Sequence, residues 1–112
     1  MKTKKELKNK YKQMKFPMGV FQIRNLSNDK VLIDNSTDMV SKWNRHQMEL
    51  KFGSHKNQDL QKDWNNTGTD NFVFEVLSEL KPDEKIISYP KELKSLQERV
   101  IEEINIEKEL RY

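Results

Sequence analysis

The chain has 112 residues, 34% of them hydrophobic and 35% charged, with a net charge of +3. This length favours one compact domain with a small core. The absence of cysteine excludes disulfides, zinc–thiolate sites and cysteine nucleophiles. No apolar run approaches the roughly 20 residues of a membrane helix, and no apolar signal segment opens the chain. We therefore expect a cytoplasmic protein that has no membrane partner.

The first 17 residues form a basic segment in which seven lysines face one acid, Glu6. Apolar side chains recur there at helical spacing (Leu7, Tyr11 and Met14) and predict a helix over residues 3–15. Pro17 ends it, because the residue before a proline avoids the α region. Such an arm can bind phosphates by releasing counterions, or it can be a solvated helix. Both alternatives remain open.

Three segments are typical of β-strands. GVFQIR (Gly19–Arg24) and Val31–Ile33 flank a polar loop, which predicts a β-hairpin. The third, FVFEVLSEL, runs from Phe72 to Leu80. Its alternation places one set of side chains on a common side: Phe72, Phe74, Val76 and Ser78.

Three helices are predicted in the remainder. The first begins after Thr37 or Asp38 as N-cap and ends with Gly53 as C-cap. The second covers residues 57–66 and the last covers residues 91–110. A buried stripe is expected on the last helix: Leu93, Leu96, Val100, Ile104 and Ile106.

The predicted order of elements is α-β-β-α-α-β-α. It indicates an α+β fold, with a small three-stranded sheet flanked by helices. There is no internal repeat or linker. We therefore expect residues 1–17 to form a basic N-terminal helix and residues 18–112 to form one domain.

The chain resembles the GIY-YIG nuclease family through a series of motifs in the family's order. GVFQIRN (residues 19–25) matches the first-strand motif, and KVLIDNS (30–36) matches the second. SKWNRH (41–46), GSH (53–55), LQKDWNNTG (60–68) and FVFEVL (72–77) follow. Spacings agree without gaps from Gly19 to Gly68, and the resemblance covers about Met18 to Ile104. It implies an antiparallel arrangement of the three strands.

The resemblance also implies a reaction, the hydrolysis of a DNA phosphodiester with one divalent metal. In the family a first-strand tyrosine acts as general base and a second-strand tyrosine positions water. An arginine stabilises the phosphate and a last-helix glutamate binds the metal. Here these positions hold, in order, Phe21, Leu32, Lys42 and Gln97. A shift of one residue would put Glu98 at the metal position instead. We expect no cofactor, and Mg²⁺ only if the domain is active.

Other family positions keep polar side chains, and the candidate nucleic-acid contacts are Lys42, Arg45, His46, Lys51 and His55. Structural alternatives exist for three of them. His46 can pack beneath Trp43, His55 can hold its turn, and Arg45 can pair with Glu49. Asp34 replaces a family glycine and opposes phosphate binding locally.

Three functions follow as hypotheses. The preferred one is a GIY-YIG-like domain that is catalytically degenerate and retained to bind nucleic acid (DNA more than RNA) or a protein partner. The second is an active, divergent metal-dependent DNA endonuclease. The third is a structural or assembly protein, such as a homodimer, that uses the C-terminal helix.

Overall fold

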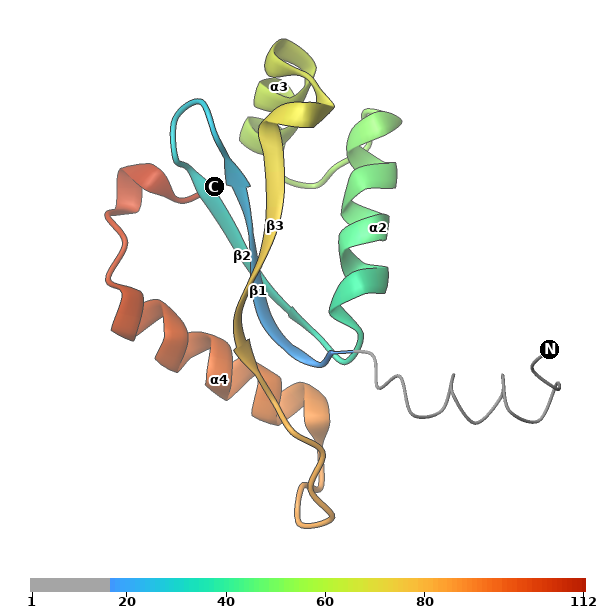
Figure 1. The fold of residues 1–112 in the computed structure, drawn as a ribbon, viewed down its shortest axis with the longest axis vertical. Helices are drawn as coiled ribbons and strands as arrows, with labels where there is room; N and C mark the ends of the chain where they lie inside the picture. Colours follow the sequence, from blue (N-terminus) through green and yellow to red (C-terminus); the bar gives the residue numbers. More distant parts are fainter. Residues whose placement is uncertain (1–16) are drawn as a thin grey trace, which may run out of the picture.

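The computed structural model describes residues 17–112. The predicted helix over residues 3–15 lies outside this range. A three-stranded antiparallel sheet forms the centre of the molecule, with the order β2-β1-β3 (Figure 1). Its strands are β1 (Gly19–Asn25), β2 (Val31–Ser36) and β3 (Phe72–Glu79). The predicted α+β fold is confirmed.

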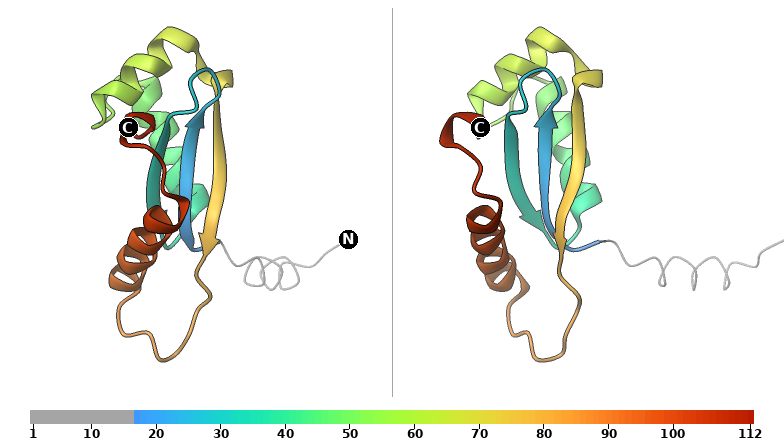
Figure 2. Two further views of the ribbon diagram at one scale, coloured as in Figure 1. Left: turned by 90° about the vertical axis from the view of Figure 1, so that its left-hand side faces the viewer. Right: turned by 60° about the vertical axis from the view of Figure 1, so that its left-hand side comes forward.

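Three α-helices flank the sheet: α2 (Met39–Lys51), α3 (Gln58–Thr67) and α4 (Tyr89–Ile104). Short 3₁₀ turns, η1 (Thr69–Asn71) and η2 (Lys108–Leu110), follow α3 and α4. Helix α4 lies across one face of the sheet, and α2 and α3 lie on the other (Figure 2). None of the described helices is long and apolar enough to cross a membrane.

The two faces of the sheet have separate apolar cores. On the α2–α3 side, Phe21 and Ile23 pack with side chains from both helices, including Met39, Leu60 and Trp64. On the α4 side the buried residues are Val20, Val31, Ile33 and Val100. Adjacent β1 residues thus supply opposite cores, as the period of two requires.

Side-chain oxygens cap the N-termini of two helices, α2 and α3. Asp38 accepts from the backbone N–H of Ser41, and Asn57 accepts from that of Leu60. Both satisfy a free N–H of the first turn. The prediction of Gly53 as the C-cap of α2 is corrected by one residue, because Phe52 is the cap. Gly53 follows it with φ 73°, a left-handed conformation that glycine adopts without a Cβ penalty.

The first residue of the GVFQIRN motif has a packing reason to be glycine. A Cβ at Gly19 would lie 2.1 Å from the backbone oxygen of Ser78. Next to this contact, the β1–β3 register shifts between Val20 and Phe21. Ser78 therefore pairs with Val20, which faces α4. The expected placement of Ser78 on the side of Phe72 is thus wrong.

The last residue of the same motif, Asn25, is fully buried and polar. Its Oδ1 accepts from the backbone N–H of Ser27 at 2.9 Å, and its Nδ2 donates to the Tyr112 hydroxyl at 2.9 Å. That hydroxyl donates to Asp63 at 2.6 Å. Asn25 therefore connects the hairpin, α3 and the last described residue.

The last helix is shorter than predicted. It ends at Ile104, and Asn105 follows in the left-handed conformation with φ 50°. The chain then turns back to the sheet, where the backbone N–H of Tyr112 donates to the carbonyl of Val31 at 2.9 Å. Ile104 is 38% exposed, so it is not part of a buried stripe. Leu93 and Val100 are buried as expected.

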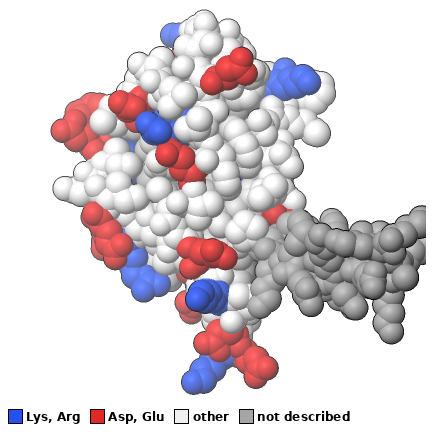
Figure 3. Space-filling view, viewed as in Figure 1, with Lys and Arg blue, Asp and Glu red and all other residues white. Residues whose placement is uncertain are grey.

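Charged side chains do not gather into one basic patch on the face seen in Figure 3, where acidic and basic groups alternate. On this face, charge alone does not mark a binding site.

Candidate functional site

A cleft of about 280 Å³ lies between β2 and the outward side of α2. We call it the α2–β2 cleft. Strand β2 supplies apolar and acidic side chains to it, and the remaining groups come from α2 and from the loop before α3. Its titratable and charged side chains are Asp34, Lys42, Arg45, His46, Glu49, His55 and Lys56.

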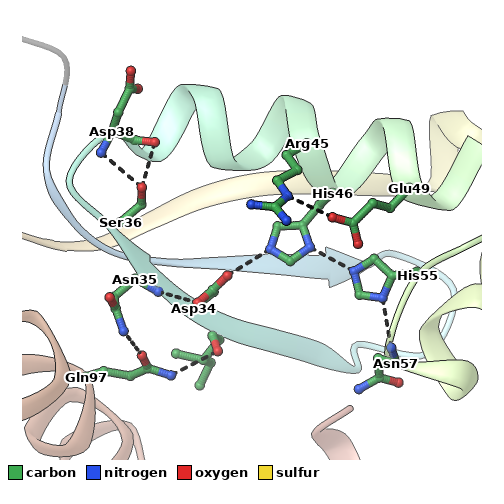
Figure 4. A network of polar contacts seen from close by, with 11 residues as sticks. Asp34, Asn35, Ser36, Asp38, Arg45, His46, Glu49, His55, Asn57 and Gln97 are labelled. Carbon is green, nitrogen blue, oxygen red and sulfur yellow. Dashed lines mark hydrogen bonds and ion pairs between the residues drawn. The ribbon is translucent and has the colours of Figure 1, made fainter. Parts of the chain in front are cut away.

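Three of these groups form a continuous polar contact, which we call the histidine bridge (Asp34, His46 and His55; Figure 4). Nε2 of His46 lies 2.8 Å from Oδ2 of Asp34. Nδ1 of the same ring lies 2.8 Å from Nε2 of His55. The bridge therefore connects β2, α2 and the loop before α3.

One backbone amide sets the direction of every proton in the bridge. The N–H of Asn57 donates to Nδ1 of His55 at 3.0 Å, so that nitrogen carries no proton. A neutral imidazole has one donor and one acceptor nitrogen. His55 must then donate from Nε2 to Nδ1 of His46, and His46 must donate from Nε2 to Asp34. Both rings are neutral in this arrangement, and no ring nitrogen is free.

The surroundings shift the pKa of two members of the bridge. Burial alone would raise the pKa of Asp34, but the hydrogen bonds from His46 and Asn35 and the charge of Lys42 outweigh burial and lower it. Burial lowers the pKa of His55, and the charge of His46 lowers it further. Asp34 is therefore held ionised and His55 is held neutral.

Three cations line the cleft, two of them on the same helix as His46. Lys42 precedes His46 by one helical turn, so the two side chains share a face. Arg45 pairs with Glu49, with Nε and Oε1 3.0 Å apart. The third cation is Lys56. Since Asp34 and Glu49 are the carboxylates present, the cleft keeps one net positive charge when both histidines are neutral.

Comparisons with known proteins point to one kind of nuclease. No protein-family model matches the chain. Over 71 residues the chain is 34% identical to intron-associated endonuclease 1 of enterobacteria phage T4, and this alignment covers 62% of the chain. The chain spans 28% of the length of that relative.

Two solved structures of the catalytic domain of the intron endonuclease I-TevI share the fold. One is a mutant form, with a TM-score of 0.66 and 27% identity, and covers 80% of this chain and 84% of that one. The other has a TM-score of 0.64 and 27% identity, and covers 79% and 88%. The chain is GIY-YIG nuclease-like in sequence and in fold.

Phe21 and Leu32, which the resemblance places at the family's two tyrosines, carry no hydroxyl. Phe21 is fully buried beneath the cleft, with its ring centroid 5.1 Å from that of Phe74 and 6.1 Å from that of His46. Leu32 lines the cleft itself with an apolar side chain. Neither group can accept or donate a proton. Apolar side chains therefore lie both in the cleft and beneath it.

Gln97, which the resemblance places at the family's metal-binding glutamate, has both ends of its amide engaged. Oε1 of Gln97 accepts from Nδ2 of Asn35, and Nε2 donates to the carbonyl of Ile33 at 3.1 Å. Glu98 is exposed, one helical position away. Nowhere in residues 17–112 do three histidine, cysteine or acidic side chains form a group that could hold a metal ion. The described residues do not fit the divalent metal typical of GIY-YIG nucleases.

The structure brings together most of the residues singled out from the GIY-YIG-like sequence. Leu32 and four of the polar candidates line the cleft: Lys42, Arg45, His46 and His55. Lys51 does not, because it lines a separate hollow beside Phe52. Gln97 also lies elsewhere, on α4 across the sheet.

The contacts of His46 differ from the packing beneath Trp43 that we expected. The ring of His46 lies edge-on to Phe21, and Trp43 stacks on Phe74, with centroids 6.0 Å apart. The bridge replaces the expected packing of His46 beneath Trp43. The Arg45–Glu49 pair is present as expected.

Sequence reasoning did not find the contribution of Lys56 or the contact between Asp34 and His46. The available signal for the second was Asp34, a carboxylate on the predicted second strand just before the helix that carries His46.

Proposed function

We propose that this domain binds the phosphate backbone of nucleic acid in the α2–β2 cleft, and that it does not cleave it by the tyrosine- and metal-dependent GIY-YIG reaction. One observation carries the proposal. The cleft presents Lys42, Arg45 and Lys56, but the positions that would supply hydroxyls and a metal ligand are Phe21, Leu32 and Gln97. The relatives' names identify them as endonucleases, which supports nucleic acid as the ligand class.

The binding half of the proposal rests on charge. A phosphodiester carries one negative charge, and each lysine or arginine that neutralises it releases condensed counterions. Lys42 and Lys56 supply this charge, whereas Glu49 offsets part of that of Arg45. Asp34 lies at the back of the same cleft, where its carboxylate accepts a hydrogen bond from His46. We therefore expect modest, strongly salt-dependent affinity.

The loss of cleavage rests on the number of missing groups. Removing one general acid or base, or one group that stabilises the transition state, typically costs on the order of 10²- to 10⁴-fold in rate. The base, the water-positioning hydroxyl and the metal ligand are all replaced here. Such effects are not additive, but their joint loss leaves little of the original reaction.

Fluorescence anisotropy with a labelled 20-bp duplex DNA tests the proposal. Binding should weaken as salt rises, and Lys42→Ala and Lys56→Ala should each reduce the slope of log K against log salt by about 1. Lys94→Ala, an exposed lysine on α4, is the matched control and should leave the slope unchanged. Absence of binding at low salt, or equal effects of all three variants, would contradict a phosphate site in this cleft.

A second candidate function, a divergent endonuclease, is favoured by the histidine bridge. If His55 turned away, Nδ1 of His46 would be a free base, with its other nitrogen held by Asp34. A histidine so oriented is a common general base.

Nicking of supercoiled plasmid separates the two functions. The assay is run with Mg²⁺, with Mn²⁺ and with chelator, using the original protein and the variants His46→Ala and Lys42→Ala. Nicking that both variants abolish, and that Lys94→Ala retains, would establish the second function. No nicking under any of these conditions would support the first.

A further inference from the structure

The outward side of α3 is rich in amide side chains. We call it the amide face, and it consists of Gln58, Gln61, Lys62, Asn65 and Asn66. All of these except Gln61 are exposed. Because successive residues turn by about 100°, the five share one side of the helix. Leu60 and Trp64 point into the core on the opposite side.

Acidic side chains of α3 lie off this face. Asp63 accepts hydrogen bonds from Tyr112 at 2.6 Å and from Asn28 at 3.2 Å. Asp59 is exposed at the border between the two sides. The amide face therefore presents neutral donors and acceptors together with one lysine, and it does not repel phosphate.

Solubility alone does not account for this composition. Helix α4 has an outward side of ordinary solvated type, rich in charged residues: Lys91, Lys94, Glu98, Arg99 and Glu102. The same chain thus places charged groups on the exposed side of α4. On α3 it uses groups that donate and accept hydrogen bonds at the same time.

A groove runs along the amide face and meets the α2–β2 cleft. It has a volume of about 420 Å³ and is bounded by α3 and by Gly53, Ser54 and His55. His55 lines both hollows. A ligand with one phosphate in the cleft would therefore have its neighbouring groups beside α3.

One part of the face is already ordered for binding. Nε2 of Gln61 donates to the carbonyl of Leu50 at 2.8 Å and to Oδ1 of Asn65 at 3.0 Å. These bonds fix the orientation of the Asn65 amide. Within residues 17–112, Gln58 and Asn66 make no side-chain hydrogen bond, so their amides are available to a ligand. A preordered amide loses less entropy on binding.

We propose that the amide face of α3 reads base edges in the major groove of duplex DNA, with a preference for adenine, while the cleft holds a nearby phosphate. This inference rests on the proposed function. Asn and Gln pair with N6 and N7 of adenine through two hydrogen bonds. The major groove of B-DNA is about 12 Å wide and admits a helix. The deep, narrow major groove of duplex RNA does not.

The test compares binding of a 20-bp duplex containing adenine with binding of the same duplex in which every adenine is 7-deazaadenine. This replacement removes the N7 acceptor in the major groove and leaves base pairing intact. The original protein should bind the unmodified duplex about fivefold or more tightly. A duplex RNA of the same sequence should bind more weakly than the DNA.

The variant Gln58→Ala/Asn65→Ala/Asn66→Ala should lose this discrimination while keeping its salt slope. The control Asn44→Ala/Gln47→Ala removes amides from α2 and should keep the discrimination. Thermal melting monitored by circular dichroism shows that each variant is folded. Unfolding of the triple variant would move the test to Asn66→Ala alone, for which partial loss is expected.

The outcomes separate the inference from the proposed function. Salt-dependent binding that is equal for both duplexes would overturn base reading and leave phosphate binding intact. Discrimination that survives the triple variant would also overturn it. No binding of either duplex at low salt would overturn the proposed function and, with it, this inference.

Discussion

Nδ1 of His46 and Nε2 of His55 lie 2.8 Å apart, and the two nitrogens share a single proton. The Asn57 N–H on one side and the Asp34 carboxylate on the other fix which ring donates. A proton added to either ring would point at a donor already present, so protonation of a ring must break one of these contacts. The hydrogen bonds of the histidine bridge should therefore be lost as the pH falls.

The first prediction follows from the lowered pKa of His55. A histidine whose pKa is lower in the folded state binds more protons when unfolded. Its contribution to stability is complete above the unfolded pKa of about 6.5 and is lost as the pH falls through the folded pKa. Urea unfolding should therefore show lower stability at pH 5 than at pH 7.5. His55→Gln should reduce this difference, and an unchanged pH profile would contradict the bridge.

The second prediction concerns the carboxylate of Asp34, which gives a further loss of stability at lower pH. Because the pKa of Asp34 is lowered, its contribution is present above the unfolded value of about 3.9 and disappears below it. Asp34→Asn should remove this later step and leave the His55 step in place. Stability measured from pH 5 down to pH 2 distinguishes the two.

A third prediction concerns Gln97, which the proposed function places where GIY-YIG nucleases have a metal ligand. Gln97→Glu removes the donor to the Ile33 carbonyl and places a carboxylate beside it. We expect a loss of about 1–3 kcal/mol in the free energy of unfolding, and no rise in melting temperature with Mg²⁺. Glu98→Gln, at an exposed position, should stay within about 0.5 kcal/mol of the original. Stabilisation of Gln97→Glu by Mg²⁺ would show that the position still fits a metal.

A fourth prediction concerns Phe21 and Leu32, which the proposed function places where GIY-YIG nucleases have tyrosines. Phe21 is fully buried, so Phe21→Tyr brings a hydroxyl into an apolar core. The expected cost is about 1–3 kcal/mol, without any gain of nicking activity. Leu32→Tyr should cost less, because Leu32 lines the cleft and its replacement can reach water. If Phe21→Tyr were as stable as the original protein, the core around residue 21 would have to accommodate the added hydroxyl, which would contradict the full burial of Phe21.

The fifth prediction uses the raised pKa of Tyr112, which burial and the hydrogen bond to Asp63 shift to about 12. A raised pKa gives stability that is complete below the unfolded value of about 10 and is lost as the pH rises through 12. Unfolding monitored between pH 8 and pH 12 should show this loss. Tyr112→Phe should be less stable at neutral pH and lack the alkaline step.

The strands and the helices α2 and α3 were predictable from the sequence because the residue patterns that mark them are local. Alternating β-formers marked Phe72–Glu79, and Asp38 and Asn57 lie directly before helical patterns. The shift between Val20 and Phe21 was not predictable, since it depends on the close approach of Gly19 to Ser78. The early end of α4 at Ile104 was missed because Asn105 is followed by Ile106 and further glutamates and lysine, a composition that continues the helical pattern.

The site was predicted in outline for a similar reason. The motifs placed Lys42, Arg45 and His46 on one helix, and spacing alone put them near one another. The contacts of His46 with Asp34 and with His55 depend on how α2 lies relative to β2 and to the loop before α3. That arrangement is tertiary, and no local pattern contains it.

The return of the chain to β2 has a consequence for self-association. An open three-stranded sheet has two edges whose backbone groups can pair with another molecule. The backbone of Tyr112 covers part of the β2 edge at Val31, and acidic side chains, Glu75 and Glu79, lie on the β3 edge strand. Charge on an edge strand discourages strand addition. Neutralising both acids would therefore remove the charge beside Val76, which is already 48% exposed, and leave an edge strand prone to edge-to-edge aggregation.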